Sequence, residues 1–309
     1  AALVHLKSIA FSYANNGTER GHVLCSIAAV YAIESILSNH ALVEAYEDEL
    51  QDIINVLVNV VCRNNEDNNT RYRNESLEKQ FRLACAHTFG TILWILKQND
   101  DNRLSSLVTK LVDSSTCRLH GNGSRDMGRY DIIALTHACR LDEELASVVV
   151  RQLVEILVGC LHFGNINPDA TPNSFLPDRE LSVAIALSTV VNSGGRHSMF
   201  AWQNTGASTQ ILRRLWSSIE SVDAKNIDKI NTVTRYLASC YEYSTPRTRL
   251  EVIKLVSPII PPLHENDTIK LNVALPILAS IVFDTECLSG ENEATTELTD
   301  MTASLCEFA

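Results

Sequence analysis

The chain has 309 residues, more than a single closed core usually holds, so it should form two compact domains or one elongated array of repeats. Hydrophobic residues make up 45% and aromatic residues 6%, while 12 Gly and 8 Pro are too few for the frequent turns of a β-sandwich or barrel. The formal net charge of −11 disfavours nucleic acid as a ligand, and no apolar run reaches the roughly 18 residues of a membrane span.

The cysteine pattern indicates free thiols in a reducing compartment. The 9 Cys are odd in number and include no C-x-x-C pair, so we expect neither a disulfide framework nor a ribbon-type zinc site. The N-terminus lacks a secretory pattern, which favours a cytoplasmic or nuclear protein. Because the chain starts at Ala1, we expect a processed chain or a segment of a larger protein.

Apolar residues recur at helical spacing in the first part of the chain. We expect helices over residues 3–14, 22–37 and 41–61, separated by Asn15-Asn16-Gly17 and by Asn39. The third helix has acidic residues opposite its apolar stripe, and a stripe of this kind has to be covered by a neighbouring helix. The stripe consists of Leu50, Ile53, Ile54, Leu57, Val58 and Val61.

The next elements are two helices between polar loops. After the Asn-rich stretch 63–73, Asn74-Glu75-Ser76 opens a helix that should run to about Gln98. Asp100-Asp101 can start the following helix, and the helical pattern then disappears over 113–128, which predicts a loop. The buried side of that second helix should contain Leu104, Leu107, Val108 and Leu111.

The second half of the chain continues the helical pattern as far as an acidic tail. Helices are expected over 130–139 and 142–161, followed by a connection rich in Pro and Gly over 164–177. Gly194-Gly195 should end the next helix, and residues 285–309 should form an acidic tail or a capping helix. The remaining expected helices are 179–191, 208–222, 226–243, 246–256 and 268–283.

About twelve helices with a pair spacing of roughly 40 to 50 residues are typical of HEAT and armadillo arrays. Three segments also share a basic residue that precedes small and branched apolar residues: Phe81 to Leu93, Arg179 to Leu187 and Lys270 to Leu275. This texture resembles the second helix of a HEAT repeat. The resemblance implies an all-α, right-handed solenoid of about six helix pairs over residues 1–284.

The sequence offers no clear catalytic, metal or cofactor site. Three Cys-x-His or His-x-Cys pairs lie on expected helices, where residues i and i+2 point about 200° apart and cannot share an ion. Cys117 and His120, on an expected loop, could share one. No nucleophile elbow, phosphate-binding loop or dinucleotide fingerprint occurs, so we expect a non-enzymatic protein with no catalytic residues, no metal and no cofactor.

Two groups of residues are candidates for partner binding. Trp202, Arg213 and Arg214 belong to residue types that are enriched at interface hot spots. The alternative is that the two arginines form a solvated helix face.

The second group lies in the expected loop over residues 113–128 and just after it. Arg118, Arg125 and Arg129 could dock an acidic segment of a partner or an anionic head group. The alternative is a disordered linker.

These observations favour a scaffold or adaptor that binds protein partners on the curved face of a repeat array within a larger assembly. A second interpretation is a structural segment that spaces other domains of a giant protein. A regulator of a nucleotide-binding enzyme is the third.

Overall fold

The fold is all-α. The computed structural model describes residues 2–16, 20–38, 47–62, 75–116, 129–161, 179–219, 224–256, 275–277 and 279–280, and this part of the chain contains helices and short connections but no strand. The helices are α1 (Ala2–Asn16), α2 (Arg20–Leu37), α3 (Glu47–Cys62), α4 (Glu75–Gln98), α5 (Arg103–Thr116), α6 (Tyr130–Leu141), α7 (Glu143–Cys160), α8 (Arg179–Ser193), α9 (Gly195–Asn204), α10 (Ala207–Ile219), α11 (Ala224–Tyr241) and α12 (Pro246–Val256).

The chain divides into two compact units, Ala1–Val149 and Val150–Ala309, and α7 crosses the boundary between them. No helix among the described residues is long and apolar enough to cross a membrane.

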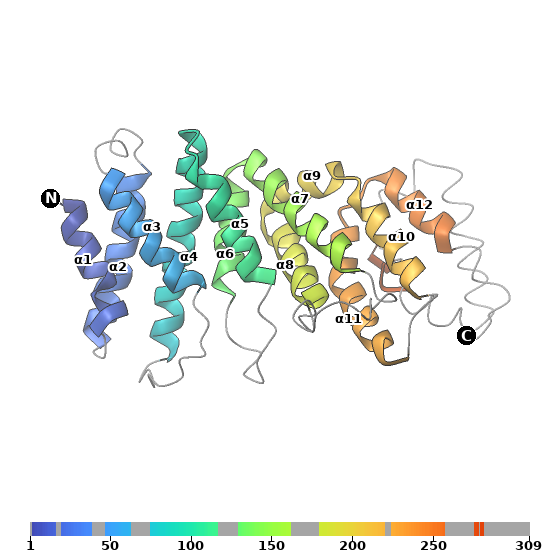
Figure 1. The fold of residues 1–309 in the computed structure, drawn as a ribbon, viewed down its shortest axis with the longest axis horizontal. Helices are drawn as coiled ribbons and strands as arrows, with labels where there is room; N and C mark the ends of the chain where they lie inside the picture. The colour runs from blue at the N-terminus through green and yellow to red at the C-terminus, as the bar shows by residue number, and fades with distance from the viewer. Residues whose placement is uncertain are drawn as a thin grey trace, which may run out of the picture. The chain divides into compact units, whose positions relative to one another are not determined.

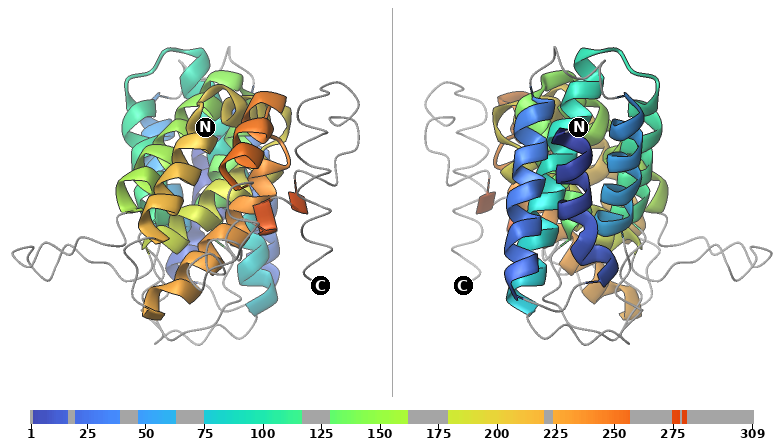
Figure 2. Two further views of the ribbon diagram at one scale, coloured as in Figure 1. Left: turned by 90° about the vertical axis from the view of Figure 1, so that its right-hand side faces the viewer. Right: turned by 90° about the vertical axis from the view of Figure 1, so that its left-hand side faces the viewer.

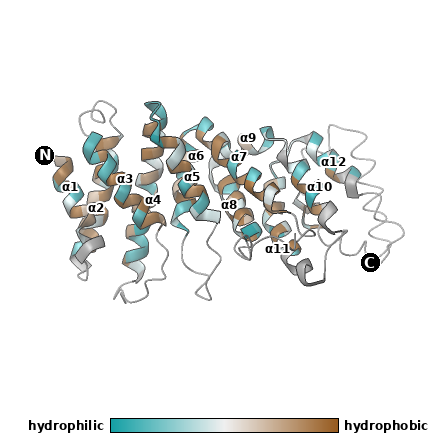
Figure 3. Cartoon of the chain, in the orientation of Figure 1, coloured by the Kyte–Doolittle hydropathy of each residue, from teal (hydrophilic) through white to brown (hydrophobic). Residues whose placement is uncertain are grey.

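Unit 1 consists of two rows of helices. In one row α2 packs against α4 and α4 against α6, while α1, α3 and α5 pack against α2, α4 and α6 respectively (Figures 1 and 2). Most of these helices carry hydrophobic and hydrophilic residues side by side (Figure 3), which is the pattern that buries one face of a helix against its neighbours. The predicted apolar stripe of α3 is confirmed, since all six of its residues are buried.

Helices α4 and α6 approach each other closely at a glycine of α4. A Cβ atom added to Gly90 would lie 2.7 Å from the carbonyl oxygen of Ala134 and 2.9 Å from the Cβ of His137. Ala134 and Ala138 are themselves fully buried. Small residues on both helices therefore allow the two backbones to approach each other.

The corner between α4 and α5 is held by backbone hydrogen bonds. The amide of Asp101 donates to the carbonyl of Leu96 at 2.9 Å, and the amide of Asp100 donates to that of Lys97 at 3.2 Å. Asp100 has a φ of 50°, so this is the Schellman arrangement with an aspartate in the left-handed position where glycine is preferred. Asp100 thus belongs to the end of α4 rather than to the start of α5.

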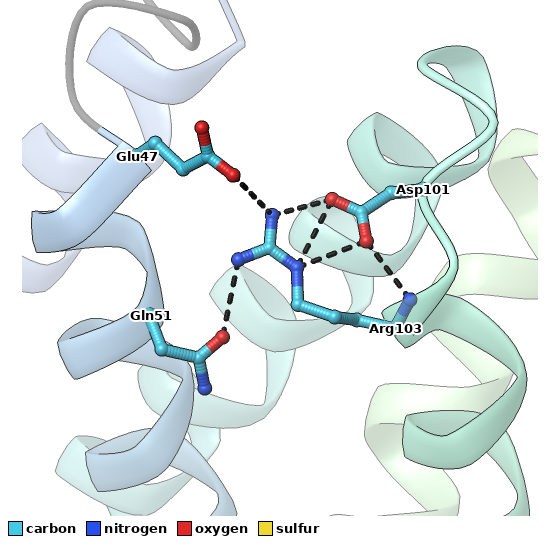
Figure 4. A network of polar contacts seen from close by, with 4 residues as sticks. All are labelled: Glu47, Gln51, Asp101 and Arg103. Atoms are coloured by element: carbon cyan, nitrogen blue, oxygen red, sulfur yellow. Dashed lines mark hydrogen bonds and ion pairs between the residues drawn. The ribbon is translucent and has the colours of Figure 1, made fainter.

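Polar side chains then attach this corner to α3 (Figure 4). The Asp101 carboxylate accepts a hydrogen bond from the Arg103 amide at 2.9 Å, which caps α5, and also binds the Arg103 guanidinium. The guanidinium in turn donates to the side-chain oxygen of Gln51 at 3.1 Å and lies 4.0 Å from the Glu47 carboxylate. The network is structural, because it connects α3 to the corner between α4 and α5 through groups that already satisfy one another.

In unit 2, α8 packs against α9 and α11, and α10 contacts α9, α11 and α12. The ring of Trp202 meets the ring of Tyr241 edge-on with 5.8 Å between centroids, and the Tyr241 hydroxyl donates to the carbonyl oxygen of Ser208. The buried Arg249 donates from Nε to the Ser244 carbonyl and from Nη2 to the Glu242 carbonyl, both at 3.0 Å. These contacts join α9, α10, α11 and α12.

The structure corrects two further expected element boundaries. Helix α5 continues through residues 113–116, because the hydroxyls of Ser115 and Thr116 donate back to carbonyls one turn earlier in the helix and both residues are buried. Gly194-Gly195 ends α8 as expected, but a further helix, α9, begins at once at Gly195. Gly195 has a φ of 72°, so the glycine redirects the chain.

Several other expectations lie outside the described residues. They are the polar stretch 63–73, most of the predicted loop over 113–128, the connection 164–177, most of the helix over 268–283 and the tail 285–309.

Candidate partner-binding surface

A cluster of polar side chains joins the three helices of the α2, α4 and α6 row. The hydroxyl of Thr91 donates to Glu34 Oε1 at 2.8 Å, and that of Thr88 lies 3.3 Å from Glu34 Oε2. The Nε2 atom of His137 lies 3.2 Å from the Thr91 oxygen. Since the Thr91 proton is directed at Glu34, the Thr91 oxygen is left to accept a hydrogen bond from the Nε2–H of His137. The cluster is therefore a chain of hydrogen bonds that runs from α6 through α4 to α2.

A second histidine extends the cluster. The rings of His87 and His137 lie 4.7 Å apart between centroids and are tilted by 52°. Burial is the main cause that lowers the pKa of His137, and the nearby His87 and Arg140 lower it further, while Glu34 opposes them. His137 is therefore neutral at pH 7.

The Glu34 carboxylate supplies the negative charge of this cluster. Its side chain is 22% exposed, and no Lys or Arg among the described residues lies within ion-pair distance of it. The Nε2 atom of His137 is 3.9 Å from Glu34 Oε1, too far for a hydrogen bond. An ionised carboxylate can accept about four hydrogen bonds, so the two threonine hydroxyls leave part of its capacity unused.

Exposed apolar side chains border the cluster. Tyr31, which is 48% exposed, lies one helical turn before Glu34, and Leu83, which is 37% exposed, lies one turn before His87. Residues three or four apart share a helix face, so both belong to the same surface as the polar cluster. We call the surface formed by Tyr31, Glu34, Leu83, His87 and His137 the α2–α4–α6 face.

The same apolar border continues along α2. Leu24 is 48% exposed, and together with Ala28 and Tyr31 it forms an exposed stripe at positions i, i+4 and i+7. Helix α2 packs against α1 and α4 on its other sides.

The predicted basic group is only partly visible. Arg118 and Arg125 lie outside the described residues. The guanidinium of Arg129 donates to the carbonyl of Ser115, so it ties the start of α6 to the end of α5. A role of these three arginines in partner binding stays a prediction.

The second predicted group does not form a common surface. The prediction is wrong for Trp202, because its side chain is fully buried against Tyr241 and cannot contact a partner. Arg213 and Arg214 are exposed on α10, and Arg213 lies 3.7 Å from Glu251 of α12. Whether these two arginines bind a partner stays a prediction.

Sequence reasoning did not identify the α2–α4–α6 face. Its residues come from three helices, and Thr88 and Thr91 are separated from Glu34 by 54 and 57 positions. One signal was present, because Glu34 is the single acidic residue in the largely apolar helix α2.

No group of three or more His, Cys, Asp or Glu that could hold a metal ion occurs among the described residues. Comparison of the chain with family models, curated proteins and solved structures finds no match.

Proposed function

We propose that this chain is a non-enzymatic scaffold of HEAT or armadillo type that binds a segment of a partner protein on its α2–α4–α6 face. One observation carries the proposal: exposed apolar side chains and an ordered polar cluster lie together on the row of packed helices α2, α4 and α6. Binding sites for proteins combine these features, since apolar groups provide affinity and fixed polar groups provide specificity.

Two further elements belong to the same proposal. The rows of unit 1 are the arrangement that a solenoid of about six helix pairs would repeat along the chain. We also propose that the protein works within a larger assembly in the cytoplasm or nucleus, as the free cysteines suggest.

The polar cluster also favours a binding protein over a spacer segment. A half-buried carboxylate is less stabilising than an apolar residue of similar size in the same place. A helix that only separates other domains would be more stable with Leu or Met at position 34.

Site-specific crosslinking tests the proposed function. A photoreactive phenylalanine analogue is placed at Leu83 on the face, and in a control chain at Asn59, which is exposed on α3 in the other row. After irradiation in cell extract, we expect a discrete crosslinked protein from position 83 and none from position 59. The same products from both positions, or none from position 83, would contradict the proposal.

A further inference from the structure

We propose that the partner segment carries a lysine or arginine whose charged head binds the Glu34 carboxylate and whose hydrocarbon stem lies beside Tyr31 and Leu83. This inference rests on the proposed function, because it specifies the chemistry of the partner that the α2–α4–α6 face binds.

Charge complementarity is the first argument. The Glu34 carboxyl group is partly exposed, and no Lys or Arg among the described residues lies within ion-pair distance of it. His137, at 3.9 Å from Glu34 Oε1, does not supply a positive charge, since burial lowers the pKa of this histidine. A cation supplied by another protein would make the charge-assisted hydrogen bonds for which the carboxylate has capacity left.

Orientation of the carboxylate is the second argument. Thr91 binds one oxygen of Glu34 and Thr88 approaches the other, so the two hydroxyls hold the carboxylate plane in place. His137 holds the Thr91 hydroxyl in turn. A carboxylate that is already fixed loses little conformational entropy when it binds a cation, which favours a bound partner over a mobile surface charge.

The apolar border is the third argument. Lysine and arginine bury their methylene groups along apolar surface and keep the charged head exposed. Tyr31 and Leu83 offer such surface within one or two turns of the carboxylate, and the Tyr31 ring can also attract a cation. An anionic segment would be repelled by Glu34 and by the chain's net charge of −11, which instead steers basic partners towards the protein.

A peptide selection tests the inference. A random library of displayed dodecapeptides is selected against the full chain, and the enriched peptides are synthesised with a fluorophore for measurements of affinity by fluorescence anisotropy. We expect these peptides to share a Lys or Arg next to an aliphatic residue. Glu34→Gln should weaken their binding about tenfold, because the amide keeps the size of the side chain but not its charge.

Two controls isolate the contact. Glu49→Gln makes the same chemical change at a half-buried residue of α3 in the other row and should leave the affinity unchanged. Replacing the peptide's basic residue by norleucine should weaken binding to the unmodified chain about tenfold, and should have little further effect on Glu34→Gln. The peptide change tests the contact even if Glu34→Gln lowers the stability of the fold.

The two proposals can fail separately. If the selected peptides lose binding to Leu83→Asp but bind Glu34→Gln and the unmodified chain equally, the face binds proteins and the inference about a cation is wrong. If no peptide is enriched, or if neither Leu83→Asp nor Glu34→Gln changes the affinity for the selected peptides, the proposed function itself is contradicted.

Discussion

Replacing Gly90 by alanine should destabilise unit 1, although alanine is the better helix former. Alanine gains about 1 kcal/mol over glycine in a helix interior. The new Cβ atom, however, would lie 2.7 Å from the Ala134 carbonyl oxygen and 2.9 Å from the His137 Cβ, so α4 and α6 have to separate. Overpacking of this kind costs about 1–3 kcal/mol, and because the obstacle here includes backbone we expect the upper part of that range, about 2–3 kcal/mol. We expect a net loss of about 1–2 kcal/mol.

Urea denaturation followed by far-ultraviolet circular dichroism measures this loss, and Gly159→Ala in α7 provides the matched control. An added Cβ at Gly159 has no neighbour within 4 Å, so the helix propensity acts alone there and should raise stability by up to about 1 kcal/mol. The two substitutions are chemically identical and should have opposite signs. If Gly90→Ala proved as stable as the unmodified chain or more so while Gly159→Ala behaved as expected, the close crossing of α4 and α6 would be refuted.

Three further outcomes are expected. In the native chain a thiol reagent should label the exposed Cys25 quickly and the buried Cys240 only on unfolding. Burial also raises the pKa of the Cys240 thiol to about 12, which keeps it in the unreactive protonated form. Equal labelling rates for the two thiols would contradict the assigned burial. Asp101→Ala should cost about 1–2 kcal/mol of unfolding free energy because it removes the cap of α5, whereas Asp52→Ala removes only an exposed ion pair and should cost less than about 0.5 kcal/mol. The Arg103 guanidinium lowers the pKa of Asp101, so the stability that this carboxylate provides is present above the unfolded pKa of about 4 and is lost as the pH falls through the folded pKa. The difference in unfolding free energy between the unmodified chain and Asp101→Asn should therefore shrink in acid. A difference that stays constant with pH would contradict this assignment.

The sequence predicted the helices well where a single apolar stripe dominates. The stripe of α3 from Leu50 to Val61 is buried as expected, because one periodic face determines both the helix and its packing. The predicted end of α5 was wrong because no apolar stripe marks its last residues. Ser115 and Thr116 are residue types common in loops. Here, however, their hydroxyls donate hydrogen bonds to backbone carbonyls of their own helix, so both side chains can be buried without an unpaired polar group.

Two other features could not be read from the sequence because they depend on tertiary contacts. Trp202 was expected at a surface, and its burial depends on Tyr241, which lies two helices later in the chain. The Glu34 cluster needs α2, α4 and α6 to lie side by side, and no local spacing of residues specifies that neighbourhood.

The corner between α4 and α5 has a consequence for how unit 1 can move. The amides of Asp100 and Asp101 are bonded to the last turn of α4, and the Asp101 carboxylate holds the first turn of α5. These backbone hydrogens should therefore exchange with solvent far more slowly than those of an ordinary surface connection, at a rate set by cooperative opening of both helices. A joint of this kind cannot act as a hinge, so α4 and α5 should keep their mutual orientation in any slow rearrangement of unit 1.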